Sequence, residues 1–318
     1  KVKAHDMAQK GVIEISKTGE VFASVTETEG MYSPVYNVQG LPNTVFQIYA
    51  AEDITTLDGT VRAYQGELVD EITTDKDGKA KSKELYLGKY TVIEKTATEG
   101  FYNSNEQYDV ELTYAGQNVS VTSTELSLYN ERQKVTISLA KELEQDETFG
   151  IGMNDEIKNV QFGIYANEDI TAADGSVIPK DALITYANCD ENGKITFNCD
   201  LPIGFKWYAK EIATDEQYVI SDTKYAFETQ YKGQTVNIYD IAINDGDPIN
   251  NSIKRGTVSG IKKDENGNAL GGALIGLFEA DTTEYTEENA LMTATSADDG
   301  SFSFVDVPYG TWCIREIK

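Results

Sequence analysis

The sequence is poor in the residues that most often hold metals. It has one histidine and three cysteines, Cys189, Cys199 and Cys313, and the cysteines show no metal-ligand spacing. We therefore expect no metal site and no cofactor. The odd number of cysteines also gives no disulfide framework, so we interpret them as separate thiols. A local disulfide between Cys189 and Cys199 is the alternative, because these two flank one turn.

Basic residues are scarce as well. The chain has 27 Lys and Arg against 53 Asp and Glu, which gives a formal net charge of −26. Such an acidic chain lacks the positive face that nucleic-acid phosphates and anionic membrane surfaces require. It also has no run of about 18 apolar residues, so no membrane-spanning helix is predicted. We expect neither nucleic acid nor membrane among its partners.

The residues that are abundant favour β-strands and an internal repeat. The chain is 40% hydrophobic, with 19 tyrosines and only six prolines. "FQIYAAEDITTLDGT" at 46–60 matches "FGIYANEDITAADGS" at 162–176, an offset of 162 − 46 = 116 residues, and a third copy begins near residue 256. Short alternating segments separated by DG and NG turns predict an all-β protein of tandem immunoglobulin-like β-sandwich domains.

The repeats also predict domain limits. We expect domain 1 at 10–131, domain 2 at 132–252 and domain 3 at 253–318, the last incomplete at its C-terminus. Residues 1–9 are interpreted as a linker or as the last strand of a preceding domain. Acidic turns resemble calcium loops locally, but none completes the EF-hand pattern, so turn chemistry is the better explanation. These turn residues are Asp75, Asp77, Asp190, Asn192, Asp264 and Asn266.

Charged residues end several apolar rows that should face a core. In each first strand the row ends in lysine, and in each late strand it ends in glutamate, because alternate residues share one face. The lysines are Lys17, Lys141 and Lys262, and the glutamates are Glu94, Glu211 and Glu316. The last strands of the first two repeats end their rows in Asn130 and Asn251.

A fixed spacing links these positions. Lys141 follows Asn130 by 11 residues, and Lys262 follows Asn251 by 11 residues. Counting back 11 residues from Lys17 reaches Asp6. Each junction between repeats therefore carries Asn or Asp followed 11 residues later by Lys.

These features resemble the Cna B-type, or SpaA-type pilin, domains of Gram-positive surface proteins. The motifs that carry the resemblance are "EISK", "SLAK", "FQIYA", "FGIYA", "LGKYTVIE", "YGTWCIRE" and the terminal "YN". The resemblance implies a spontaneous Lys–Asn or Lys–Asp isopeptide bond assisted by the glutamate. It implies the triads Lys17–Glu94–Asn130 and Lys141–Glu211–Asn251, and an incomplete third site with Lys262 and Glu316 but no acceptor.

The second repeat departs from the first in two ways. "GFKWYAKE" has one residue more than "GKYTVIE" between Gly and Glu, and "INNS" offers both Asn250 and Asn251 as acceptor. The alternative for either triad is an ordinary buried ion pair, or charged residues at strand ends in water.

The chemistry explains why a carboxyl group would face the core. A lysine amine attacks only when neutral, and desolvation lowers its pKa. A glutamic acid in the same apolar site can stay protonated, polarise the Asn carboxamide and transfer protons while ammonia leaves. Packing would hold amine and carbonyl together at high effective concentration.

The expected function is therefore structural rather than enzymatic. We interpret the chain as a stalk segment of a pilin or adhesin, extracellular and anchored to the cell wall through a region outside this chain. Its expected partners are neighbouring domains of the same surface protein. The alternative is an adhesin module that binds a host protein or glycan.

We also predict that residues 1–8 of one chain complete repeat three of a neighbour, with Asp6 near Lys262 and Glu316.

Overall fold

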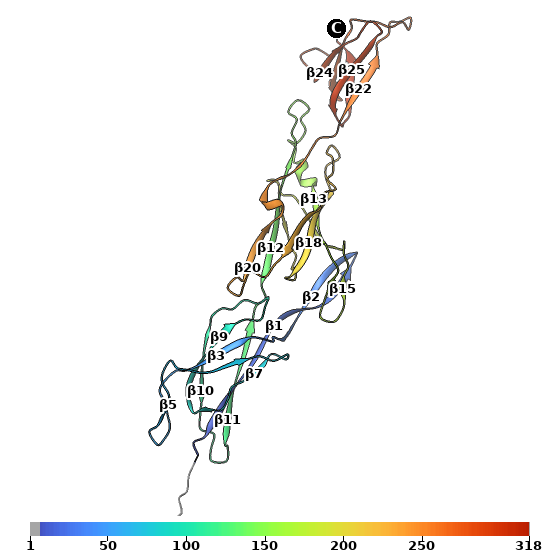
Figure 1. Cartoon of the computed structure of the whole chain (residues 1–318). Helices are drawn as coiled ribbons and strands as arrows, with labels where there is room; N and C mark the ends of the chain where they lie inside the picture. The colour runs from blue at the N-terminus through green and yellow to red at the C-terminus, as the bar shows by residue number, and fades with distance from the viewer. Residues whose placement is uncertain (1–6, 318) are drawn as a thin grey trace, which may run out of the picture.

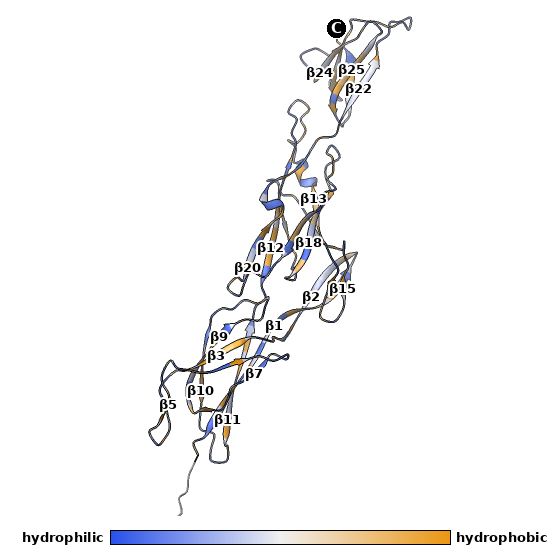
Figure 2. Ribbon diagram, in the orientation of Figure 1, coloured by the Kyte–Doolittle hydropathy of each residue, from blue (hydrophilic) through white to orange (hydrophobic). Residues whose placement is uncertain are grey.

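The computed structural model describes residues 7–317 and places tandem β-sandwich domains in an elongated row (Figure 1). The predicted all-β class is confirmed. Buried and half-buried residues alternate along β3, and Figure 2 shows hydrophobic and hydrophilic colours together in the strands. The domain limits at 131/132 and 252/253 stay predictions. Asp6 lies outside the described residues, so its predicted contact with Lys262 also stays a prediction.

The first domain is a sandwich of two sheets. The parallel pair β1 and β11 lies on one side, with β7 and β8 also paired to β1, and the sheet β10-β9-β3-β6 lies on the other. Buried apolar residues such as Ile15, Phe46 and Val92 fill the space between them. The strands are β1 (Lys10–Thr28), β2 (Met31–Gly40), β3 (Val45–Ala50), β4 (Ile54–Thr55), β5 (Val61–Ala63), β6 (Leu68–Thr73), β7 (Lys79–Lys81), β8 (Leu85–Tyr86), β9 (Gly88–Thr96), β10 (Gln107–Leu112) and β11 (Val121–Asn130).

The second domain repeats this plan. Strand β12 pairs with β17 and, in parallel, with β20 and β21, and it faces the sheet β16-β13-β18-β19 across a core that contains Trp207. The elements are β12 (Lys134–Leu143), η1 (Glu156–Asn159), β13 (Gln161–Ala166), β14 (Ile170–Thr171), β15 (Val177–Ile178), β16 (Leu183–Asn188), β17 (Lys194–Phe197), β18 (Phe205–Ala213), β19 (Tyr225–Thr229), β20 (Ile238–Ala242), η2 (Ile243–Gly246) and β21 (Ile249–Asn251).

The third domain is smaller. Its sheets are β22-β25 and β24-β23-β26, with Leu277 and Phe304 in the core between them. The strands are β22 (Arg255–Ile261), β23 (Leu274–Glu279), β24 (Met292–Thr295), β25 (Ser301–Pro308) and β26 (Trp312–Glu316). Phe149 from the second domain packs edge-on against Trp312, with ring centroids 5.0 Å apart.

A long hairpin joins the first two domains. Strand β1 continues beyond the first sandwich, turns at Glu29 and Gly30, which both have positive φ, and returns as β2. We call residues 19–40 of this hairpin the arm. The arm lies beside β15 of the second domain (Figure 1) and joins sheets of both domains, because β2 pairs with β16. The alternation in "GEVFASVTETEGMYSPVYNVQG" fits such a hairpin, but the repeat comparison did not predict it, because the second repeat has no equivalent segment of this length.

Candidate functional sites

Lys17, Glu94 and Asn130 meet inside the first sandwich. The Lys17 Nζ lies 2.7 Å from Glu94 Oε2 and donates to Asn130 Oδ1 at 2.5 Å. Asn130 Nδ2 donates to Glu94 Oε1 at 2.6 Å, so each side chain contacts the other two. Their exposed fractions are 0%, 4% and 5%. The strands β1, β9 and β11 thus bring the predicted residues together in a buried, closed triad.

Strand register accounts for the recurrence of this geometry. In the parallel pairing of β1 and β11, Lys17 lies opposite Leu128, two residues before Asn130. In the pairing of β12 and β21, Lys141 lies opposite Ile249, two residues before Asn251. Because residues two apart on a strand share one face, both asparagines project to the same side as the lysine.

A turn glycine fixes the backbone of each lysine. Lys17 N donates to Gly78 O at 2.8 Å, and Lys141 N donates to Gly193 O at 2.7 Å. Both glycines have φ of +74°, and a Cβ on either would lie 2.2 Å from Lys17 O or 2.1 Å from Lys141 O. The acidic turns that resemble calcium loops therefore have a structural role. Their aspartates accept backbone N–H groups, as Asp75 does from Lys79 at 2.9 Å.

The second triad is buried but arranged differently. Asn251 Nδ2 donates to Glu211 Oε1 at 2.7 Å, whereas Lys141 Nζ donates to the backbone oxygens of Ile249 at 2.9 Å and Glu142 at 2.8 Å. Lys141, Glu211 and Asn251 are each 2% exposed. Within residues 7–317, the buried Asn251 Oδ1 has no hydrogen-bond partner.

The structure distinguishes the two candidate asparagines of the second domain. Asn250 is exposed, and its Nδ2 donates to Pro248 O at 3.3 Å. Asn251 is buried beside Glu211. The extra residue in "GFKWYAKE" does not disturb this face, because Trp207, Ala209 and Glu211 remain buried along β18.

Burial changes the acidity of both lysines. Burial lowers the pKa of Lys17 from its usual value, although the hydrogen bond and charge of Glu94 oppose the shift. Burial lowers the pKa of Lys141 to about 8, against the opposing charge of Glu211. Each amine is thus more readily neutral, and hence nucleophilic, than a lysine in water.

The third pair is more exposed than its predicted place on an inward row implies. Lys262 Nζ lies 3.2 Å from Glu316 Oε2, but the side chains are 24% and 49% exposed. Within the described chain, β22 pairs only with β25 and lacks the parallel partner that covers β1 and β12. The pair is therefore accessible to water, and a pair of this kind contributes little stability.

Some contacts around the second site were not predicted from the sequence. Thr214 Oγ1 accepts from Asn251 Nδ2 at 3.2 Å, and the backbone N of Ser221 donates to Glu211 Oε2 at 2.7 Å. Both residues lie in irregular loops, so strand alternation could not place them. Cys189, Cys199 and Cys313 are free thiols.

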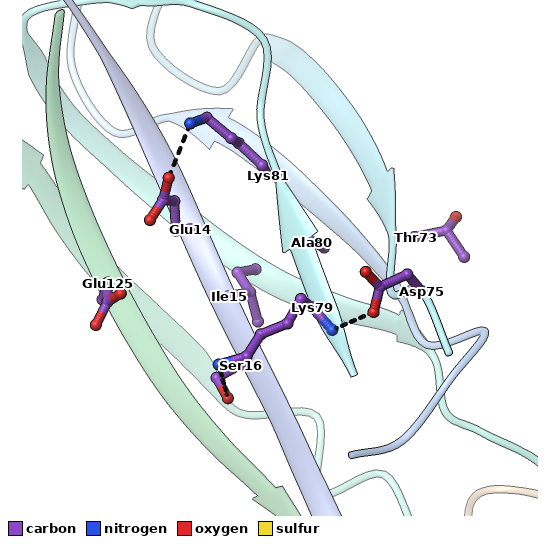
Figure 3. Close-up of a pocket in the computed structure, with 9 residues that line it drawn as sticks. All are labelled: Glu14, Ile15, Ser16, Thr73, Asp75, Lys79, Ala80, Lys81 and Glu125. Carbon is purple, nitrogen blue, oxygen red and sulfur yellow. Dashed lines mark hydrogen bonds and ion pairs between the residues drawn. The ribbon is translucent and has the colours of Figure 1, made fainter. Parts of the chain in front are cut away.

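A surface groove beside β1 and β7 lies apart from the triads. Figure 3 shows its lining, where Lys81 pairs with Glu14 at 2.9 Å, and Lys79 Nζ donates to Ser16 Oγ at 2.9 Å. Within residues 7–317, no group of three or more His, Cys, Asp or Glu could hold a metal ion. The helices of the described chain are all too short to cross a membrane.

Comparison with protein-family models identifies the family of this chain. The model of the SpaA prealbumin-like fold domain matches residues 35–126, 150–242 and 256–318. The chain belongs to this family. The SpaA-domain matches include Glu94, Glu211, Lys262 and Glu316. Four residues lie outside the matched ranges: Lys17, Asn130, Lys141 and Asn251. The juxtaposition of these lysines and asparagines is therefore a finding of the structure.

The solved structures that match this chain include proteins of three bacteria. The TIE protein of Bacillus anthracis has 20% identity and a TM-score of 0.62, over 98% of this chain and 45% of that one, so this chain spans less than half of its length. BcpA, the major pilin subunit of Bacillus cereus, has 16% identity and a TM-score of 0.36, over 98% and 88%. The shaft pilin SpaA of Lactobacillus rhamnosus GG has 12% identity and a TM-score of 0.27, over 77% and 98%. A search of curated proteins found no match to this chain.

Proposed function

We propose that this chain is a shaft segment of a Gram-positive pilin or adhesin, stabilised by autocatalytic isopeptide bonds Lys17–Asn130 and Lys141–Asn251. The observation that carries the proposal is the buried, closed triad of Lys17, Glu94 and Asn130. Membership of the SpaA family and the elongated row of domains support the shaft role. The segment is extracellular in this proposal and is anchored to the cell wall through a region outside this chain.

The geometry of the first triad suits amide exchange. Lys17 transfers a proton from Nζ to Glu94 Oε2 across 2.7 Å, and the neutral amine attacks Asn130 Cγ. The Nζ–Cγ bond forms and the Cγ–Nδ2 bond breaks. Glu94 gives its proton to Nδ2, with which it is already hydrogen-bonded, and the nitrogen leaves as ammonia. Nζ loses its second proton to Glu94, which therefore ends the reaction protonated. The buried site holds the reacting groups in contact, which replaces an unfavourable encounter step.

The second site requires one movement before the same reaction. Lys141 Nζ must leave the backbone oxygens of Ile249 and Glu142 and turn toward the Asn251 amide. Asn251 already donates to Glu211, as Asn130 donates to Glu94. We propose that this domain forms its bond after that rotation. In both domains the glutamate acts once on its own chain, so the protein has no external substrate.

Intact mass spectrometry of the full chain tests the bonds. We expect a mass lower than that of the sequence by two ammonias. Glu94→Ala and Glu211→Ala should each restore one ammonia. Lys262→Ala is the matched control and should retain the deficit, because its pair is exposed and has no acceptor strand in the described chain. An unmodified wild-type mass would refute the proposed bonds.

A ligand-binding adhesin module is the second candidate function. The observation that favours it is the groove of Figure 3, which charged side chains line from both strands, with Glu14 on β1 and Lys79 and Lys81 on β7. A host protein or a glycan would then be the partner. Screening the full chain on glycan and extracellular-protein arrays tests this role, with Lys81→Glu as the groove variant. A hit that survives this substitution would place the ligand elsewhere.

A further inference from the structure

The arm occupies a defined site on the second domain. The backbone N–H groups of Ala173 and Asp174, in the β14–β15 hairpin, donate to Phe22 O at 3.2 Å and Ala23 O at 3.0 Å. Val25 N donates back to Ser176 Oγ at 2.8 Å. Beside this hairpin, β2 of the arm continues the sheet at β16, where Met31 pairs with Leu183.

Apolar contacts accompany these hydrogen bonds. Phe22, Val25 and Tyr32 of the arm pack against the core of the second domain. The Phe22 ring lies edge-on to Phe205, with centroids 6.3 Å apart. Backbone pairing at a sheet edge, together with apolar anchors, is a general mode of β-strand recognition.

The first domain carries the equivalent elements. The hairpin "ITTLDGTV" at 54–61 corresponds to "ITAADGSV" at 170–177, so Leu57, Asp58 and Thr60 match Ala173, Asp174 and Ser176. Strand β6 corresponds to β16 by register, because Tyr49 pairs with Leu68 as Tyr165 pairs with Leu183. Both ladders also shift register immediately before that tyrosine.

This equivalent surface has no arm on it in the described chain. Strand β6 is the edge of its sheet, and within residues 7–317 the Leu57 and Asp58 N–H groups donate to no protein acceptor. Large apolar side chains are exposed around it: Leu57 fully, Tyr64 65% and Leu68 45%. Figure 1 shows the hairpin with β5 projecting away from the other domains. Unpaired strand edges with exposed apolar residues are templates for strand addition.

We propose that residues 54–68 of the first domain form an arm socket, which binds a β-hairpin arm projecting from another SpaA-type domain. The Leu57 and Asp58 N–H groups donate to two successive carbonyls of that arm, Thr60 Oγ1 accepts an arm N–H, and the arm continues the sheet at β6. The arm of the same chain is already docked on the second domain. By register the first repeat has Gly88 at the position of Phe205, because Ala50 pairs with Tyr90 as Ala166 pairs with Trp207. Leu57 in place of Ala173 supplies an apolar contact at the arm's aromatic side chain.

Hydrogen exchange of the full chain tests the socket directly. The probe is a head-to-tail cyclised peptide with the sequence of residues 19–40, whose hairpin is first verified by slow exchange of its own cross-strand amides. At saturating peptide, we expect amides in residues 55–70 to exchange at least tenfold more slowly. The same peptide with Phe22→Asp is the control ligand and should give no protection.

A second variant separates the socket from nonspecific binding. Leu57→Asp removes the exposed apolar contact in a fully exposed turn, and should abolish the protection without altering exchange elsewhere in the first domain. Absence of protection at 55–70 with the verified hairpin overturns the proposal, as does equal protection of the Leu57→Asp chain. Hydrogen exchange at residues 55–70 does not depend on the isopeptide bonds. This experiment can therefore refute the arm socket without refuting the proposed crosslinks, and a normal mass would refute the crosslinks without refuting the socket.

Discussion

Asn251 donates its amide Nδ2 to Glu211 Oε1 at 2.7 Å, while the Oδ1 of the same buried amide has no partner within residues 7–317. An unpartnered buried oxygen costs about 1–3 kcal/mol. Rotation of Lys141 toward Asn251 would provide a donor for that oxygen and bring the amine to the amide carbon. The arrangement of the second site is thus consistent with a state that precedes reaction.

The acceptor in the second domain can be identified by substitution. We expect Asn251→Ala to restore one ammonia to the intact mass, because it removes the buried amide beside Glu211. Asn250→Ala is the matched control and should retain the deficit, because this neighbour is exposed. Peptide mapping of the crosslinked fragment gives an independent assignment, and a bond to Asn250 would contradict the prediction.

Loss of the first crosslink should reduce stability strongly. Glu94→Gln keeps the size of the side chain but removes the proton acceptor. Lys17 and Asn130 are 113 residues apart, and a crosslink that closes a loop of this length contributes about 4–5 kcal/mol by chain entropy. We expect the first domain of the variant to unfold at lower denaturant concentration and to become sensitive to protease. A variant that unfolds together with the wild type would show that the bond is absent or has no energetic effect.

The turn glycine under Lys17 should be as important as the triad itself. In Gly78→Ala, the added Cβ would lie 2.2 Å from Lys17 O at a φ of +74°, so β1 must shift and the Lys17 amine with it. We expect slower or incomplete crosslinking, measured as a mixture of masses in freshly purified protein. Gly59→Ala is the control: its φ is +80° but nothing lies within 4 Å of the added Cβ. Equal crosslinking of the two variants would exclude this positioning effect.

The free Lys141 amine should make the stability of the second domain depend on pH. The Asn251→Ala variant, in which the proposed bond cannot form, keeps the lysine. The pKa of Lys141 is about 8 in the folded chain, below its ordinary value of 10.5, so between these values the unfolded chain binds the proton that the folded chain does not. Stability should therefore rise as pH increases from about 8 to 10.5.

Thermal unfolding of the Asn251→Ala variant at a series of pH values measures this effect. The control is the Asn251→Ala/Lys141→Met double variant, which has no titrating amine at this position. The melting temperature of the double variant should rise less between pH 8 and pH 10.5 than that of the single variant, because no lysine amine titrates at position 141. Parallel pH profiles for the single and double variants would contradict the assignment.

Arg132 should hold the arm to the second domain. It is 7% exposed, makes a bidentate pair with Asp200, lies 3.3 Å from Glu20, and stacks on Tyr36 at 3.7 Å. Arg132→Ala should cost about 2 kcal/mol, less than a fully buried pair, because Asp200 is half exposed.

The measurement for Arg132→Ala is denaturant unfolding combined with limited proteolysis at the arm turn. Lys158→Ala, which removes an exposed pair with Asp155, should cost less than about 0.5 kcal/mol. Arg132→Lys should not restore stability, since an ammonium cannot reproduce the planar bidentate contact. Equal stability of the Arg132→Ala and Lys158→Ala variants would argue against the role.

The sequence was informative where strand alternation was regular. Alternation identified Lys17, Glu94 and Asn130 as residues that each end an apolar row, and the 11-residue spacing related the two domains. Their grouping as a triad came from the resemblance to SpaA-type domains. The same logic gave Lys262 and Glu316 as an inward pair, whereas both are partly exposed. Alternation predicts which face a residue occupies. It does not predict whether another strand covers that face.

The arm illustrates a different limit. Its alternating residues read as strand, but alternation does not reveal that Phe22 and Val25 pack on another domain. That packing depends on β16 and the β14–β15 hairpin, which lie far away in the sequence. Val25 and Ser176, for example, are hydrogen-bonded across a separation of 151 residues. Likewise, the different hydrogen bonds of Lys17 and Lys141 follow from side-chain rotation, on which a sequence pattern carries no information.

The parallel pairing of β1 and β11 has a consequence for a shaft under tension. Pulling on the two chain ends draws these adjacent strands past each other. With the proposed bond, tension passes from Lys17 directly to Asn130, and the 113-residue span between them is bypassed. That span would extend to about 400 Å if it unravelled, at about 3.3–3.6 Å per residue. The crosslink would therefore fix the contour length of the domain and leave its intervening loops free to vary in sequence without bearing load.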